Sequence, residues 1–96
     1  MTLDEFRATI AEPAPPEGMS HALQTLWWDA KGDWNKAHHC SQLYDGRTGS
    51  SVHAYLHRKE GDMSNAAGWY KRAGRVPPTV SLEAEWESLA RELLDA

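Results

Sequence analysis

The sequence predicts a single all-α domain, and three observations support this prediction. Apolar residues recur at helical spacing along most of the 96-residue chain, glycines and prolines separate these periodic stretches, and no stretch alternates as a strand does. A chain of this length has room for one hydrophobic core. We therefore expect six helices and no strand in one domain over residues 1–96.

The N-terminal helix is expected over residues 1–12. Thr2 and Glu5 are spaced as a capping box, in which each side chain accepts a hydrogen bond from the other residue's backbone N–H. Behind this cap, one helix face carries Leu3, Phe6 and Ile10. Three prolines, at 13, 15 and 16, end the helix and predict a stiff connector over residues 13–19.

The middle of the chain contains a repeat with a period of 29 residues. Residues 23–44 and 52–73 align without a gap, so that Gly32-Asp33 matches Gly61-Asp62. Glycine ends a helix by adopting the left-handed conformation, and aspartate then caps the next helix. The sequence thus predicts two antiparallel helix–turn–helix repeats, over residues 20–45 and 50–76, with residues 45–50 as the turn between them. The second helix of the first repeat is expected to extend to Tyr44.

A C-terminal amphipathic helix is expected over residues 81–95. Pro77 and Pro78 stop the preceding helix, and Ser81 caps the new one. One face is apolar and the other acidic, as in a helix that closes a stacked array against solvent. The apolar stripe consists of Leu82, Trp86, Leu89, Ala90, Leu93 and Leu94.

The segment from Gly61 to Pro78 resembles the second half of a tetratricopeptide repeat. The Gly-Asp turn is followed by Ala66, Tyr70 and Ala73 at the family's spacing of small, aromatic and small residues. The likeness covers roughly residues 20–78. It departs from the family in its period, 29 instead of about 34, and in having histidines where the first helix usually carries leucine and tyrosine.

This resemblance implies a protein-interaction module whose concave face is lined by the first helix of each hairpin. The corresponding exposed positions would include Leu26 and Asp29 together with a basic-aromatic face of Tyr55, Arg58 and Lys59. Trp28 and Trp69 are the candidate apolar anchors. The implied partner is another protein, an acidic peptide or a second copy of the chain. Residues 53–58 and 69–74 also resemble short bacterial proteins, which implies no function.

The histidines suggest a different function. His53, His57 and Glu60 lie on one helix face, and His38 from the neighbouring helix could complete a shell for Zn²⁺ or Fe²⁺. Such a face could bind a metal or act as general acid and base in a small hydrolytic protein. The sequence favours a structural interpretation over this one, because the repeat alignment places His53 and His57 where the first helix packs against its partner. They would then be partly buried histidines that hydrogen-bond to Tyr70 or to a backbone carbonyl, and pH sensing is a third alternative.

Other classes of function are disfavoured. A net charge of −4 argues against nucleic-acid binding, and no apolar run is long enough to cross a membrane. Cys40 lies between histidines but is expected to be a packed apolar residue, and as the only cysteine it suggests a reducing cytoplasm. Because no nucleotide, hydrolase or metalloprotease motif occurs, the sequence favours a binding protein over an enzyme.

Overall fold

The computed structural model describes residues 1–43 and 46–95, and within these ranges it contains six helices and no strand. The helices are α1 (Leu3–Thr9), α2 (His21–Ala30), α3 (Trp34–Gln42), α4 (Arg47–Glu60), α5 (Met63–Arg72) and α6 (Leu82–Leu94). The predicted all-helical class is therefore confirmed. The predicted extension of α3 to Tyr44, and the first residue of the predicted turn, Asp45, lie outside the described residues.

The predicted starts of α1, α3, α5 and α6 are confirmed by their side-chain caps. Thr2 and Glu5 form the capping box of α1, and Ser81 caps α6, while Ser20, which was not predicted as a cap, caps α2. Asp33 and Asp62 cap α3 and α5 after glycines with φ near +88°. In both turns the left-handed glycine ends one helix and the next residue's carboxylate accepts backbone N–H bonds of the next.

The predicted turn over residues 45–50 is wrong from Arg47 onward, because α4 begins there. Gly46, with φ of 132°, is the last residue before the helix. Within the first turn of α4, the Ser51 hydroxyl donates to the Arg47 carbonyl at 2.9 Å and the Ser50 N–H donates to the Gly46 carbonyl. Only the first of the two glycines in this segment therefore breaks the helix.

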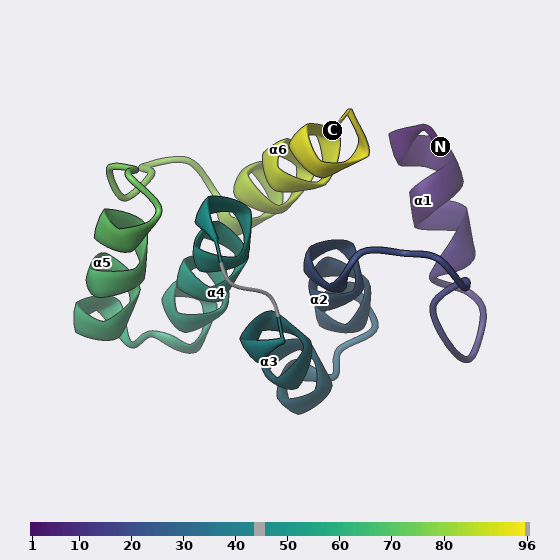
Figure 1. The fold of residues 1–96 in the computed structure, drawn as a ribbon, viewed down its shortest axis with the longest axis horizontal. Helices are drawn as coiled ribbons and strands as arrows, with labels where there is room; N and C mark the ends of the chain where they lie inside the picture. The colour runs from purple at the N-terminus through teal and green to yellow at the C-terminus, as the bar shows by residue number, and fades with distance from the viewer. Residues whose placement is uncertain (44–45, 96) are drawn as a thin grey trace.

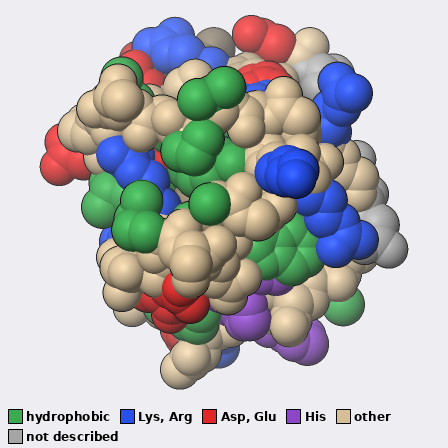
Figure 2. Space-filling view, turned by 90° about the vertical axis from the view of Figure 1, so that its left-hand side faces the viewer, with side chains coloured by type: hydrophobic (Ala, Val, Ile, Leu, Met, Phe, Trp, Pro, Cys, Tyr) green, Lys and Arg blue, Asp and Glu red, His purple; other side chains and the backbone are tan. Residues whose placement is uncertain are grey.

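The helices pack as two adjacent pairs with α6 laid across them (Figure 1). The pairs are α2 with α3 and α4 with α5, and α3 contacts α4. The C-terminal helix contacts α1, α2 and α4, so the two ends of the chain lie on the same side of the molecule (Figure 1). The face of the molecule on the α5 side carries hydrophobic, basic and histidine side chains next to one another (Figure 2).

The hydrophobic core lies between α1, α2, α4 and α6. Phe6, Leu26, Trp27 and Leu56 are fully buried there, and Trp86 stacks on Phe6 with ring centroids 5.8 Å apart. A smaller cluster of Ala54, Ala66 and Tyr70 joins α4 to α5, where the alanines let the helix backbones approach closely. Helix α4 is in the centre and contacts every other helix except α1.

Candidate metal centre

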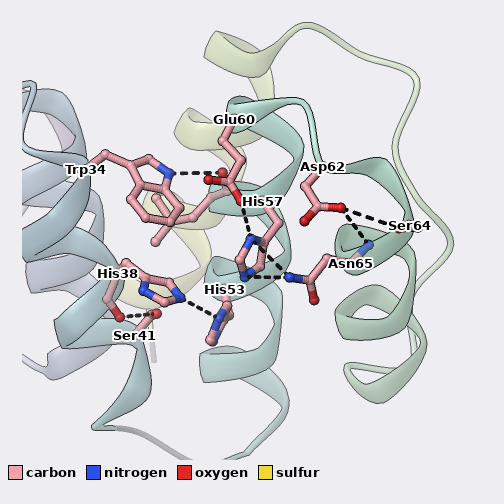
Figure 3. A network of polar contacts seen from close by, with 10 residues as sticks. Trp34, His38, Ser41, His53, His57, Glu60, Asp62, Ser64 and Asn65 are labelled. Carbon is pink, nitrogen blue, oxygen red and sulfur yellow. Dashed lines mark hydrogen bonds and ion pairs between the residues drawn. The ribbon is translucent and has the colours of Figure 1, made fainter.

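Three histidines from two helices converge between α3 and α4 (Figure 3). His53 and His57 are one helical turn apart on the buried face of α4, and His38 projects toward them from α3. Ring nitrogens of all three lie within 4.8 Å of one another. The structure thus brings together the three histidines that the sequence identifies as candidate ligands.

The spacing of these nitrogens suits one small cation. The Nε2 atoms of His38 and His53 are 3.1 Å apart, and the His57 ring centroid lies 4.9 Å from that of His53 and 5.3 Å from that of His38. Tetrahedral zinc with Zn–N bonds of about 2.0–2.1 Å separates its ligand nitrogens by about 3.3 Å. The His38–His53 pair is therefore spaced as two zinc ligands are, and side-chain rotation would bring in the nitrogen of His57, which lies within 4.8 Å.

Glu60 orients one of these imidazoles from behind. Its Oε1 lies 2.8 Å from Nδ1 of His57, which leaves Nε2, the nitrogen that faces the Asn65 amide at 3.4 Å, as the candidate ligand atom. A carboxylate that accepts the second N–H of a ligating histidine fixes its tautomer and raises its basicity. The prediction that Glu60 is a ligand is therefore replaced by a supporting role in this geometry. A second grouping of His57, Glu60 and Asp62 is also close enough for a metal, but Asp62 already caps α5.

Two tryptophans enclose the centre. The ring of Trp34 stacks on His38 at 4.7 Å, and that of Trp69 stacks on His53 at 3.9 Å. Burial, followed by the neighbouring His57 and His38 and by Arg72, lowers the pKa of His53 to about 4. Burial and then His57 also lower the pKa of His38. Both rings are consequently neutral at physiological pH, which is the state that binds metals.

The sequence signals missed two members of this centre. Trp34 is one helical turn before His38, a spacing from which the stacking could have been predicted. The Nδ2 atom of Asn65 lies 3.4 Å from Nε2 and 3.5 Å from Nδ1 of His57, and no motif pointed to this residue. Tyr70, a predicted histidine partner, donates instead to Glu85.

The predicted basic-aromatic face is not one exposed surface, because Tyr55 is buried, Arg58 is half-buried and Lys59 is exposed. Tyr55 is 2% exposed, and its hydroxyl donates to Asp29 at 2.8 Å, so the expectation that it is exposed is wrong. Asp29 and Leu26 are buried as well. Lys59 donates to the other oxygen of Asp29, and Arg58 to Glu85, both at 2.8 Å. The physical reason is charge pairing across helices, which lets polar groups enter the core.

The other predicted sites have different environments. Trp28 is half-buried, with the Lys36 ammonium 4.3 Å above its ring, and Trp69 is half-buried against His53. Cys40 is buried, and burial raises the pKa of its thiol, so it is the packed residue that the sequence predicted. His39 is exposed, because adjacent residues on a helix point in different directions.

A groove of about 800 Å³ lies on the opposite side of α4 from the histidines. It runs between α2, α4 and the first turn of α6, and Tyr55, Lys59, Trp86 and Leu82 contribute to its walls. The first helix of each pair, α2 and α4, therefore lines this surface. Its two cations already have carboxylate partners: Lys59 pairs with Asp29, and Arg7 with Glu87.

Comparison of the chain with models of known protein families, with curated proteins and with solved structures found no match. Among the described residues, no helix combines the length and the apolar character needed to span a bilayer.

Proposed function

We propose that the protein binds one divalent transition-metal ion through His38, His53 and His57. The observation that supports this most strongly is the convergence of three ring nitrogens from two helices, with the carboxylate of Glu60 behind one of them. A hydrogen bond between His38 and His53 uses one proton and one lone pair, whereas an ion would bind the lone pairs of both nitrogens at once.

Zn²⁺ is the proposed ion. Imidazole suits Zn²⁺, Cu²⁺, Ni²⁺ and Fe²⁺, and Zn²⁺ binds nitrogen sites more tightly than Fe²⁺. Three protein ligands leave one of four zinc positions for water or a further ligand, the number found at catalytic zinc sites. Zinc in such a site lowers the pKa of its bound water, which would supply the hydrolytic chemistry that the histidines suggested.

The test is metal binding to protein stripped with EDTA. Zn²⁺ and, without oxygen, Fe²⁺ are titrated by calorimetry, and the fluorescence of Trp34 and Trp69 is recorded because both rings stack on candidate ligands. We expect one ion per chain. A metal that binds only the folded state at about 100 times its Kd stabilises it by about 2.7 kcal/mol. In a domain of this size that corresponds to a rise in Tm of roughly 10–20 °C.

Variants separate a metal centre from a structural network. His38→Ala should weaken zinc binding at least 100-fold, whereas His39→Ala, an exposed neighbour on the same helix, should leave it unchanged. Co²⁺ added in place of Zn²⁺ should give the visible spectrum of a tetrahedral nitrogen site. If folded wild-type protein binds no ion, or if both variants lose binding equally, the proposal is wrong.

The groove supports a second candidate function, peptide binding by a tetratricopeptide-like array. In this interpretation α2–α3 and α4–α5 are two hairpins of that kind, and an extended peptide lies between α2, α4 and α6. Labelled acidic and neutral peptides are tested by fluorescence anisotropy. Ala84→Arg would obstruct the groove, whereas Ser88→Arg places the same charge at an exposed position of α6 outside it. If Ala84→Arg and Ser88→Arg bound the peptides equally well, the groove would be excluded as the peptide-binding site.

A further inference from the structure

A small pocket of about 210 Å³ adjoins the metal centre on the side of His53. Its walls come from three helices: the end of α3, the beginning of α4 and the last turn of α5. Such a volume is below the 300–1,000 Å³ of pockets for drug-sized ligands, so an occupant would be a small ion or acid. The lining residues are Ser41, Gln42, Gly46, Ser50, His53, Trp69 and Arg72.

The pocket and the metal centre lie along one stripe of α4. Gly46, Ser50, His53 and His57 are spaced four, three and four residues apart, which places them on one helix face. The stripe begins at the N-terminal end of α4, where backbone N–H groups and the helix dipole favour an anion. Gly46, the N-cap, has no side chain that could accept these bonds.

Two strongly buried side chains offer unused polar atoms to the pocket. Ser50 is 6% exposed and His53 is 5% exposed. His53 uses Nε2 toward His38, and neither its Nδ1 nor the Ser50 hydroxyl has a hydrogen-bond partner among the described residues. Every fully buried side-chain polar atom of those residues has a partner, so these two atoms are accessible from outside the protein, and both residues line the pocket. A ligand in the pocket could therefore reach two polar atoms of side chains that are otherwise buried.

The charge of the pocket favours an anion. Arg72 forms no ion pair within residues 1–43 and 46–95, and its guanidinium carbon lies 5.0 Å from the centre of the Trp69 ring. No acidic side chain is among the described residues of the lining. Basic side chains stand beside a hydrophobic patch on this end of the molecule (Figure 2). A guanidinium, a hydroxyl and an imidazole N–H are the donors that an oxyanion requires.

We propose that this pocket binds a small oxyanion, of the carboxylate or phosphate type, which accepts the Nδ1–H of His53 and thereby strengthens metal binding at its Nε2. The anion would orient His53 as Glu60 orients His57. This inference rests on the proposed zinc centre, and it makes that centre a paired site for a metal and an anion. The binding of one would then favour the binding of the other by the same factor.

The experiment uses sulfate, a tetrahedral oxyanion that does not precipitate zinc, and acetate as the carboxylate. Zinc Kd is measured by calorimetry in chloride and in saturating sulfate or acetate at equal ionic strength. We expect zinc to bind about tenfold more tightly with the oxyanion, within the 10–100-fold effect of changing a supporting partner of a metal ligand. Sulfate should bind about tenfold more tightly to the zinc-loaded protein than to the stripped protein.

Arg72→Gln should abolish sulfate binding and the tenfold gain. Its zinc Kd in chloride should be no weaker than that of the wild type, because removing a cation near His53 cannot repel Zn²⁺. Lys71→Gln, the neighbouring exposed cation outside the pocket, is the matched control and should behave as the wild type. Ser50→Ala should weaken sulfate binding without altering zinc Kd in chloride.

The outcomes distinguish the two proposals. Zinc binding that sulfate and acetate leave unchanged would overturn the anion pocket and leave the zinc centre standing. Sulfate binding to a protein that takes no zinc, if lost in Arg72→Gln, would overturn the zinc centre and the coupling while supporting the pocket. Equal loss of sulfate in Arg72→Gln and Lys71→Gln would show only general charge attraction and would refute the pocket.

Discussion

Replacing Glu85 with alanine is expected to lower the free energy of unfolding by about 3–5 kcal/mol, the cost of removing one partner from a buried charge pair. The Glu85 side chain is only 8% exposed and joins three helices. One oxygen accepts from Arg58 of α4 at 2.8 Å and the other from the hydroxyl of Tyr70 of α5 at 2.5 Å. Arg58 also donates to the Val80 carbonyl, so the carboxylate lies in a continuous network.

The size of the effect follows from what the variant would leave behind. The Arg58 side chain is 16% exposed and Tyr70 is 1% exposed, so neither reaches enough water to replace the carboxylate. Burial, together with the hydrogen bond to Glu85, raises the pKa of Tyr70, whose hydroxyl therefore remains a donor in need of an acceptor. The loss corresponds to a fall in Tm of roughly 15–30 °C in a domain of this size.

A double-mutant cycle makes the reasoning testable. Urea unfolding, followed by circular dichroism, is measured for Glu85→Ala, Tyr70→Phe and the double variant. Tyr70→Phe alone should cost about 1.5–3 kcal/mol, the range for a hydrogen bond to a charged group. In the Glu85→Ala background it should cost much less or stabilise, since the orphaned hydroxyl is removed. Equal costs in both backgrounds, or less than about 1 kcal/mol for Glu85→Ala, would refute the network as described.

Further predictions concern pH and the glycines. In EDTA, the free energy of unfolding should fall as pH drops from 6.5 toward 4. His53 binds a proton in the unfolded chain but not in the folded one, where burial, and after it His57, His38 and Arg72, lowers its pKa to about 4. Across this pH range, the urea midpoint of His53→Gln should decline less than that of the wild type. If the two midpoints fell in parallel with pH, the lowered pKa of His53 would be contradicted. Gly61→Ala should destabilise by about 1–2 kcal/mol because φ is +89° there, whereas Gly68→Ala, within α5 and facing open space, should stabilise by about 0.5–1 kcal/mol. If Gly61→Ala and Gly68→Ala shifted the Tm in the same direction, this reasoning would be contradicted.

The fold was predictable wherever residues close in sequence determine where a helix starts or ends. Caps, left-handed glycines and apolar stripes depend on residues within a few positions of one another, so the helix starts at Leu3, Trp34, Met63 and Leu82 follow from the sequence. The start of α4 did not, because a second glycine, buried within its first turn, resembled a loop signal. A glycine's conformation there depends on tertiary packing, which a local pattern does not contain.

The site was predictable only in part for the same reason. His53 and His57 share a face because both are on one helix, but the angle between α3 and α4 that brings His38 within 3.1 Å is set by packing of the whole bundle. The pairing of Asp29 with Tyr55 and Lys59 spans 26 and 30 residues. Without knowledge of these partners, charged residues on a first helix are indistinguishable from a solvent-exposed binding face.

The two sides of α4 differ in how their buried polar groups are satisfied, and this difference favours the histidine side as the site of chemistry. On the side that faces α2 and α6, each buried carboxylate has a cation and a tyrosine hydroxyl, so charge is balanced within the chain. On the side that faces α3 and α5, the imidazoles of His38 and His53 are neutral and meet nitrogen to nitrogen, where a single proton can serve only one bond. A cation can be shared by both nitrogens and by His57 at once. The proposed zinc ion would thus replace hydrogen bonds that already pair the buried polar atoms on this side of the helix.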